Sequence, residues 1–288
     1  MIPQVLATDL DGTLIPLEDN AQNVDDLPKI SAQLARADMQ LLFATGRHLA
    51  SILTVMDQAD LPQPAWIVGD VGTSLYRYVA TASAAEVKST ATSSQPTRPA
   101  SPSSYPLVDE YAQHLQSIVG DFGVAQLADQ LRPIDGLRVQ EEEKQSRFKL
   151  SYYVDHVVIA EVVRRVAEHL DESNAPYTTV ASRDPFTGDG LIDLLPKRVN
   201  KAYAINWWAA HNSIDRRAIL YAGDSGNDAA VFAAGYRSII VANADAAVLT
   251  AAQAAHLKSG WRDRIFAAPA PATSGVLAGL QHYIAPAS

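Results

Sequence analysis

The sequence predicts an α/β fold in which a core built on a parallel sheet is interrupted by a smaller inserted α/β module. Short apolar segments alternate with segments of helical periodicity, and polar residues stand directly after several of the apolar segments. This rhythm stops after residue 78 and returns near residue 196. Such alternation is typical of βα units that share one parallel sheet. We therefore expect a core of residues 1–78 and 196–288, with the inserted module at residues 79–195.

The first half of the core begins with a buried strand at residues 5–8, which ends in the polar run Asp9-Leu10-Asp11-Gly12-Thr13. A helix is expected at about residues 25–37, where apolar residues recur at spacings of three and four. The elements expected after it are a strand at 39–44 that ends at Thr45-Gly46-Arg47, a helix at 48–58, and a strand at 65–68 that ends at Gly69-Asp70.

The inserted module opens with an unusual segment, because residues 80–106 are mostly Ala, Ser, Thr and Pro. A segment of this composition buries little apolar surface. We therefore expect a flexible insertion there.

Regular elements are expected in the rest of the module. The periodicity predicts a helix at about residues 107–119, a strand at 148–153 and a helix at about 157–170, with strand-like runs that continue to Leu195. Within the predicted strand, Lys149 and Ser151 alternate with apolar neighbours. This alternation indicates a sheet with one covered face.

The βα rhythm of the core returns with Asn200, which can cap a helix whose apolar face includes Ile205 and Trp208. A strand at residues 218–222 follows and ends at the run Gly223-Asp224-Ser225-Gly226-Asn227-Asp228. A further strand is expected at residues 237–241.

Composition narrows the possible functions. The 288 residues carry a formal net charge of −9, include 48% hydrophobic residues and contain no cysteine. The lack of cysteine excludes disulfides, thiolate metal sites and a cysteine nucleophile, and it is compatible with the cytoplasm, where we expect the protein. The acidic charge argues against non-specific binding to nucleic acid or anionic membranes. An anionic substrate would therefore need a local device such as a metal ion or a helix N-terminus.

Neither a membrane span nor a signal peptide is expected. No apolar run approaches the roughly 20 residues that a membrane helix needs. The N-terminus lacks a basic flank, and Asp9 interrupts its apolar stretch early.

Polar residues from four loops are expected to meet at one edge of the core sheet. Loops that follow parallel strands collect at that edge, which is where ligands bind in such folds. The side chains concerned are Asp9, Asp11, Thr45, Lys201, Asp224 and Asp228. Several carboxylates with one lysine suit a divalent cation and a phosphoryl group, and hard oxygen ligands favour Mg²⁺. Lys197 competes with Lys201, but we prefer Lys201 because it opens a helix whose N-terminus also favours an anion.

Four features of the sequence resemble the four motifs of the haloacid dehalogenase superfamily. They are Asp-x-Asp-Gly-Thr at residue 9, Thr-Gly-Arg at residue 45, the later lysine, and Gly-Asp-Ser-Gly-Asn-Asp at residue 223. The likeness covers the whole core and implies a Rossmann-like core with a type-2 cap. Three segments are similar to sucrose-phosphate phosphatases: residues 147–152, residues 192–196 leading into Asn200-Lys201, and residues 223–228. The run at residues 68–76 also resembles that group.

The resemblance implies a role for each core residue. Asp9 would be the nucleophile that forms an aspartyl-phosphate, and Asp11 would protonate the leaving oxygen and later deprotonate water. Thr45 and the Gly46 amide would bind the phosphoryl oxygens, and Lys201 would offset their charge. The Mg²⁺ ligands would be the Asp9 carboxylate, the Asp11 backbone carbonyl and Asp224, with Asp228 close by or acting through water.

Substrate-binding candidates are less constrained. In the cap, Lys149, Arg183 and Asp193 are candidates for binding sugar hydroxyls, with ordinary solvated side chains as the alternative. Asn227 in the fourth motif joins them as a substrate-binding candidate.

The expected function is that of a Mg²⁺-dependent phosphomonoester hydrolase for a small phosphorylated sugar, with sucrose 6-phosphate as the first expectation. Glucosylglycerol phosphate, mannosyl-3-phosphoglycerate and trehalose 6-phosphate are alternative substrates. Two other functions stay open: a weakly catalytic module that binds a sugar-phosphate synthase, and a phosphomutase. The Ala/Ser/Pro-rich insertion motivates the first of these as an interaction segment.

Overall fold

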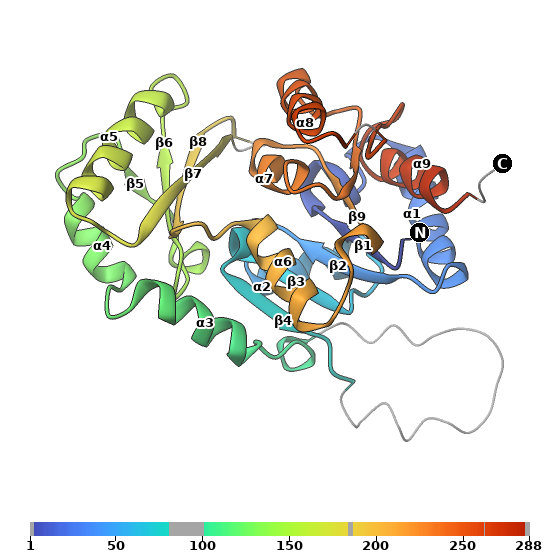
Figure 1. Cartoon of the computed structure of the whole chain (residues 1–288), viewed down its shortest axis with the longest axis horizontal. Helices are drawn as coiled ribbons and strands as arrows, with labels where there is room; N and C mark the ends of the chain where they lie inside the picture. Colours follow the sequence, from blue (N-terminus) through green and yellow to red (C-terminus); the bar gives the residue numbers. More distant parts are fainter. Residues whose placement is uncertain (1–2, 81–100, 184–186, 262, 286–288) are drawn as a thin grey trace.

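The chain forms two sheets that lie side by side (Figure 1). The computed structural model describes residues 3–80, 101–183, 187–261 and 263–285. A seven-stranded sheet has the order β11-β10-β9-β1-β2-β3-β4, and a four-stranded sheet has the order β5-β6-β8-β7. The predicted α/β core with an inserted module is confirmed.

The larger sheet is parallel except at one edge, where β4 runs antiparallel to β3. Its central strand β1 is hydrogen-bonded to β2 on one side and to β9 on the other, although β9 is more than 200 residues away in the sequence. Its strands are β1 (Val5–Thr8), β2 (Gln40–Ala44), β3 (Trp66–Gly69), β4 (Ser74–Arg77), β9 (Ile219–Gly223), β10 (Arg237–Ile240) and β11 (Ile265–Ala267). We call this sheet with its helices the core.

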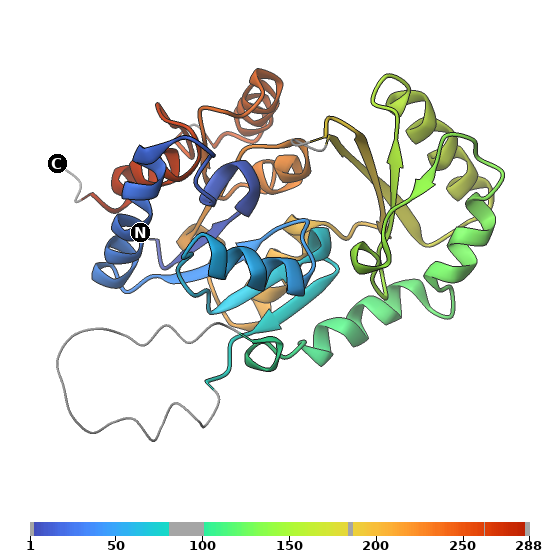
Figure 2. The same ribbon diagram turned by 180° about the vertical axis from the view of Figure 1, so that it is seen from behind.

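Helices cover both faces of the core sheet, as Figures 1 and 2 show from opposite sides. One face packs against α1 (Ala21–Arg36), α2 (Leu49–Gln58) and α9 (Ala272–Ile284), and the other against α6 (Lys201–His211), α7 (Ala229–Phe232) and α8 (Ala246–Lys258). The first helix begins about four residues before the predicted start, because the Asn20 side chain accepts a hydrogen bond from the Asn23 amide and caps it there.

The smaller sheet belongs to the inserted module, which we call the cap and define as Asp109–Pro196. Its strands are antiparallel. Its elements are α3 (Asp109–Val119), α4 (Val124–Leu131), β5 (Arg138–Val139), β6 (Leu150–Val154), α5 (Ile159–Glu172), β7 (Tyr177–Arg183) and β8 (Gly190–Pro196). Two of its helices, α4 and α5, lie on the side away from the core, whereas α3 runs beside β4 and α6 of the core (Figure 1).

The two faces of the cap sheet differ in chemistry. Leu150, Ile192 and Leu194 are buried with the cap helices in one apolar cluster. Lys149 and Asp193 lie on the opposite face, and Lys149 contacts the core. The alternation predicted for residues 148–153 is therefore present in the structure.

The Ala/Ser/Pro-rich segment is only partly described, because residues 81–100 lie outside the described residues. Its last six residues pack against the core. The Tyr105 side chain is buried and donates a hydrogen bond to the Pro64 carbonyl, and the Val79 amide donates to the Ser104 carbonyl. The predicted C-terminal boundary of the flexible insertion, residue 106, therefore lies too far along the chain. Burial of the large aromatic side chain of Tyr105 holds the end of the segment against the core.

None of the helices in the described part of the chain is long and apolar enough to cross a membrane.

Candidate active site

The loop after β1 brings Asp9 to the carboxyl edge of the core sheet. Asp9 is 3% exposed, its Oδ1 accepts a hydrogen bond from the Leu10 amide at 2.7 Å, and its amide donates to the Ala222 carbonyl of β9. The chain then turns at Gly12, whose φ is +69°. A Cβ there would lie 2.5 Å from Asp224 Oδ2, so glycine is required for the close approach of the two loops.

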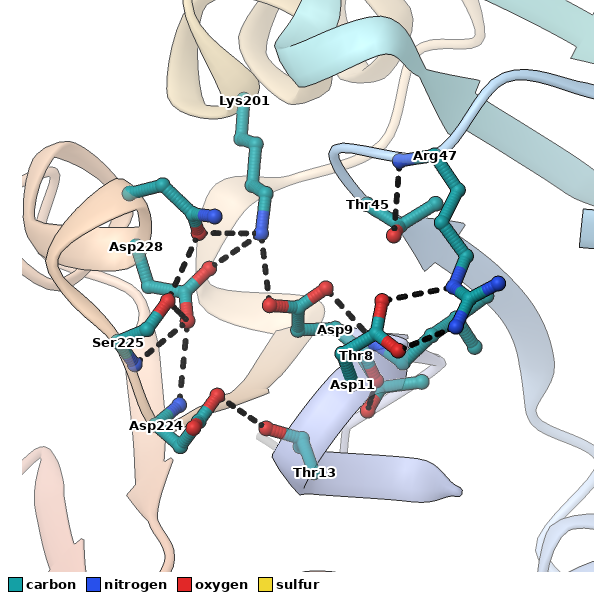
Figure 3. Close-up of polar contacts among 12 residues, drawn as sticks. Thr8, Asp9, Asp11, Thr13, Thr45, Arg47, Lys201, Asp224, Ser225 and Asp228 are labelled. Atoms are coloured by element: carbon teal, nitrogen blue, oxygen red, sulfur yellow. Dashed lines mark hydrogen bonds and ion pairs between the residues drawn. The ribbon is translucent and has the colours of Figure 1, made fainter. Parts of the chain in front are cut away.

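Lys201 lies at the start of α6 with a fully buried side chain. The helix begins there because the Asn200 side chain accepts a hydrogen bond from the Tyr203 amide. The Lys201 ammonium lies 2.9 Å from Asp9 Oδ2, 2.7 Å from Asp228 Oδ1 and 2.6 Å from Asn227 Oδ1 (Figure 3). Lys197 forms no such contact among the described residues. The structure therefore favours Lys201 of the two predicted alternatives.

Asp228 is buried beneath this edge and already has several partners. Its Oδ1 accepts hydrogen bonds from Lys201 and from the Tyr221 hydroxyl of β9, at 2.7 and 2.5 Å. Its Oδ2 accepts hydrogen bonds from the Asp224 and Ser225 amides, both at 3.1 Å. Asp228 thus fixes the loop after β9 and holds Lys201 in place.

The carboxylates of Asp9, Asp224 and Asp228 form a compact acidic group, with one oxygen of each lying within 4.8 Å of the others. Burial, with the charge of Asp228 in addition, raises the pKa of Asp224 to about 6. Burial also raises the pKa of Asp9, despite the opposing charge of Lys201. Burial by itself lowers the pKa of Lys201, but the charges of Asp228 and Asp9 outweigh it and raise that pKa.

A hard divalent cation fits this acidic group. Crowded carboxylates whose pKa values are raised repel each other, and a cation between them relieves that repulsion. Asp224 Oδ2 accepts no hydrogen bond among the described residues, whereas both oxygens of Asp9 and both of Asp228 already contact donors of the protein. The donor set is therefore one that suits Mg²⁺.

The Asp11 side chain stands apart from this acidic group. Both of its oxygens contact the Arg47 guanidinium, which follows Thr45 and Gly46 after β2 (Figure 3). Thr45 is buried, and its hydroxyl oxygen accepts a hydrogen bond from the Arg47 amide at 3.3 Å. The carboxyl ends of β1, β2 and β9, with the start of α6, thus bring the predicted core residues to one site.

The cap candidates are placed differently from one another. The Lys149 ammonium reaches across to the core, 3.1 Å from Asp70 Oδ1 and 3.4 Å from the Gly46 carbonyl oxygen. Asp193 is on the same face of the cap sheet and accepts a hydrogen bond from Ser151 at 2.5 Å. Burial raises the pKa of Asp193, against the charge of Lys149.

Arg183 is not brought to these residues. It is exposed, it donates a hydrogen bond to the Gly188 carbonyl of its own hairpin, and it lies opposite Gly190 in the sheet register. That register puts it on the face that carries Ile192 and Leu194, which pack against the cap helices.

Three residues of this region had no predicted role: Arg47, Asp70 and Tyr221. Arg47 and Asp70 stand in runs that the sequence singled out, so their positions after β2 and β3 were a usable signal. Tyr221 had no such signal, because a tyrosine inside a buried strand is typical of a packed core.

Comparison with known proteins gives a consistent result. The model of the family described as sucrose-6F-phosphate phosphohydrolase matches residues 2–90 and 102–284. A putative HAD-like hydrolase from Nitrosococcus oceani is 33% identical over 244 residues, which are 83% of this chain. The matched region is 59% of that protein, so the chain spans only about three fifths of this relative's length.

Two further relatives match along nearly their whole length. A mannosylfructose-phosphate phosphatase from Agrobacterium fabrum is 26% identical and is aligned over 97% of this chain and 96% of its own. The crystal structure of the sucrose-phosphatase from Synechocystis sp. PCC6803, in complex with sucrose and phosphate, has a TM-score of 0.74 at 25% identity and 98% coverage of both chains.

Proposed function

Since the chain belongs to the family of sucrose-6F-phosphate phosphohydrolases, we propose that it hydrolyses the phosphate ester of a small sugar with the help of Mg²⁺. The observation that carries this proposal is the Asp9 carboxylate, which lies 2.9 Å from the buried Lys201 ammonium at the edge of the core sheet. A nucleophile beside a fixed positive charge, with further carboxylates for a cation, is the arrangement that phosphoryl transfer requires.

The reaction would proceed in two displacements. An Asp9 carboxylate oxygen attacks phosphorus, the bond from phosphorus to the sugar oxygen breaks, and Asp11 gives its proton to that oxygen. Water then attacks the aspartyl-phosphate while Asp11 takes a proton from it. The bond from phosphorus to Asp9 breaks, and inorganic phosphate leaves with Asp9 restored.

The other core residues would bind and orient the phosphoryl group. Lys201 balances the charge on Asp9 and on the phosphoryl oxygens, while the Thr45 hydroxyl and the Gly46 amide donate hydrogen bonds to those oxygens. Asp9, Asp224 and the Asp11 backbone carbonyl would hold Mg²⁺, with Asp228 supporting them from beneath. When bound, the cation supplies charge neutralisation that lets an anion enter this acidic protein.

We propose sucrose 6-phosphate as the substrate to test first. Its support is the family match and the likeness to a sucrose-phosphatase. The mannosylfructose-phosphate phosphatase relative supports a phosphorylated disaccharide more broadly. On the cap, Lys149 and Asp193 are proposed to contact sugar hydroxyls, and Asn227 beside Lys201 is proposed to contact the substrate. Arg183 is the weakest of these candidates because its side chain contacts its own hairpin.

The test is a phosphate-release assay with the purified full chain. The panel contains sucrose 6-phosphate, mannosylfructose phosphate, glucosylglycerol phosphate, mannosyl-3-phosphoglycerate, trehalose 6-phosphate and hexose phosphates, each with MgCl2 or with EDTA. We expect magnesium-dependent turnover that favours a disaccharide phosphate, and none with Asp9→Asn. Failure to hydrolyse every sugar phosphate would contradict the proposal.

The same assay separates the alternatives. Isomerised sugar phosphate in place of free phosphate would indicate a phosphomutase. Binding to a sugar-phosphate synthase would be supported by co-purification of the two proteins together with turnover too slow to measure.

A further inference from the structure

The segment Asp70–Gly72, directly after β3, has an unusual backbone. Its three residues have φ values of +51°, +57° and +103°. This left-handed region suits glycine but is rare for aspartate and unfavourable for a β-branched residue such as Val71. Such a conformation persists only where the surrounding structure fixes it, and it is concentrated at functional sites.

The backbone of this segment is hydrogen-bonded to the loop that carries Thr45 and Gly46. The Val71 amide donates to the Thr45 carbonyl at 3.1 Å, and the Asp70 amide donates to the Arg47 carbonyl at 3.0 Å. The Thr45 carbonyl and the Gly46 amide belong to one planar trans peptide, so the C=O and N–H bonds point in opposite directions. The Val71 amide holds the Thr45 carbonyl toward Asp70–Gly72. The Gly46 N–H is therefore held pointing away from Asp70–Gly72.

The same segment contacts the start of α6. A Cβ at Gly72 would lie 2.4 Å from the Asn200 carbonyl carbon and oxygen, and 2.8 Å from the Lys201 nitrogen. The backbone therefore fits against the residue that opens α6 with no room for a side chain. The segment Asp70–Gly72 thus contacts two parts of the proposed catalytic site, the Thr45–Gly46 loop and the start of α6 at Lys201.

The cap contacts this segment at two points. The Tyr111 hydroxyl of α3 donates a hydrogen bond to the Gly72 carbonyl at 2.6 Å. The Lys149 ammonium forms an ion pair with Asp70 Oδ1 at 3.1 Å, and both side chains are almost fully buried. Asp70 Oδ2 accepts a hydrogen bond from Ser74, while Oδ1 accepts none among the described residues. The buried Oδ1 therefore depends on the charge of Lys149.

We propose that Asp70 is a positioning residue that couples the placement of the cap to the orientation of the Gly46 amide. Lys149 reaches both Asp70 and the Gly46 carbonyl, so one cap side chain holds the two core loops together. When the cap is seated, Asp70–Gly72 is held and the Gly46 N–H stays aimed for the phosphoryl group. The inference rests on the proposed function in one respect, namely that Gly46 binds phosphate.

The test uses Asp70→Asn, because asparagine tolerates the left-handed conformation and can still accept a hydrogen bond from Ser74. Only the ion pair with Lys149 is lost. We expect kcat to fall about tenfold with a sugar phosphate and also with p-nitrophenyl phosphate, and the inhibition constant of inorganic phosphate to rise by a similar factor. Lys149→Met should give the same change with p-nitrophenyl phosphate and with inorganic phosphate, which carry no sugar. In these two measurements the double variant should lose little more than either single variant.

Asp60→Asn is the matched control. Asp60 also has a left-handed backbone, with φ of +49°, but it lies exposed just beyond the end of α2. This variant should retain the parent kcat and phosphate affinity. A thermal melt checks that each variant folds, and if Asp70→Asn does not fold, Lys149→Met carries the test.

Two results would overturn the proposal. One is a folded Asp70→Asn variant with unchanged kcat and phosphate affinity. The other is a folded Asp70→Asn variant in which only the KM for the sugar phosphate rises, since that would make Asp70 part of a sugar subsite. If the parent hydrolyses nothing, the proposed function fails. The affinity for inorganic phosphate with MgCl2, compared between parent and Asp70→Asn, then still decides the positioning role.

Discussion

Arg47 binds both carboxylate oxygens of Asp11, with Nε 2.7 Å from Oδ2 and Nη2 2.6 Å from Oδ1. The third guanidinium nitrogen donates to the hydroxyl of Ser51 in α2 at 2.7 Å, which ties the Arg47 side chain to that helix. The bidentate geometry is the strongest that these two groups can form. Asp11 is therefore held at the edge of the site by this pair.

Replacing Asp11 tests its proposed proton-transfer role. We expect Asp11→Asn to lower kcat by about 10²–10⁴-fold, because the leaving oxygen is no longer protonated. The affinity for Mg²⁺ should change little, since only the backbone carbonyl of Asp11 is proposed to bind the cation. Steady-state kinetics and calorimetric titration with MgCl2 measure the two quantities. A variant that keeps its kcat would exclude Asp11 as the acid and base.

Lys201 and Lys197 provide a matched pair. Lys201→Ala should abolish turnover and destabilise the fold by about 3–5 kcal/mol, because it leaves Asp9 and Asp228 buried without a counter-charge. Lys197→Ala should leave both quantities near the parent values. Phosphate release and urea unfolding at neutral pH check this. The reverse pattern would transfer the role to Lys197.

Metal affinity should depend on pH through Asp224, whose pKa is raised to about 6. Below that pH the carboxyl binds a proton that the cation has to displace, so the Mg²⁺ affinity should fall up to about tenfold for each further pH unit. Above about pH 7 this contribution should level off. Calorimetric titrations across the range measure it. In Asp224→Asn the affinity should be weak throughout and its pH dependence should be shallower, because Asp9 is then the one remaining proposed ligand with a raised pKa. An equally steep dependence there would contradict the assignment.

Asp193 should affect the pH dependence of stability. Its pKa in the fold is raised by burial above the ordinary value of about 3.9, so the folded state disfavours the ionised form. The penalty is absent at low pH and grows as the pH rises through the folded pKa. Asp193→Asn, which can still accept the Ser151 hydrogen bond, should therefore gain stability relative to the parent from about pH 4 to pH 7. Urea unfolding at both pH values measures the difference in unfolding free energy between Asp193→Asn and the parent. A difference that becomes smaller as the pH rises would contradict the prediction.

The sequence by itself predicted the βα order of the core up to β10, except for β4 and α7, and it predicted the loops at the carboxyl edge of the sheet. These features are local: an apolar strand followed at once by Asp9, Thr45 or Asp224 is visible in neighbouring residues. Parallel strands then force such loops to the same edge. Elements beyond β10 were not predicted. One of them, α8, is rich in alanine and has only Ala252 and His256 buried, so it lacks a stripe of large apolar residues.

Tertiary structure alone decided which polar side chains meet. Arg183 and Asp193 look equally suitable as sugar ligands, yet the β7–β8 register puts Arg183 on the helix-covered face and Asp193 opposite Ser151 and Val180. A strand's pairing register sets which face each side chain occupies, and a shift of one residue would exchange them. Likewise, Asp11 with Arg47 and Asp70 with Lys149 are pairs of residues far apart in the sequence. Only the packing of β1 against β2, and of the cap against the core, brings these charges together.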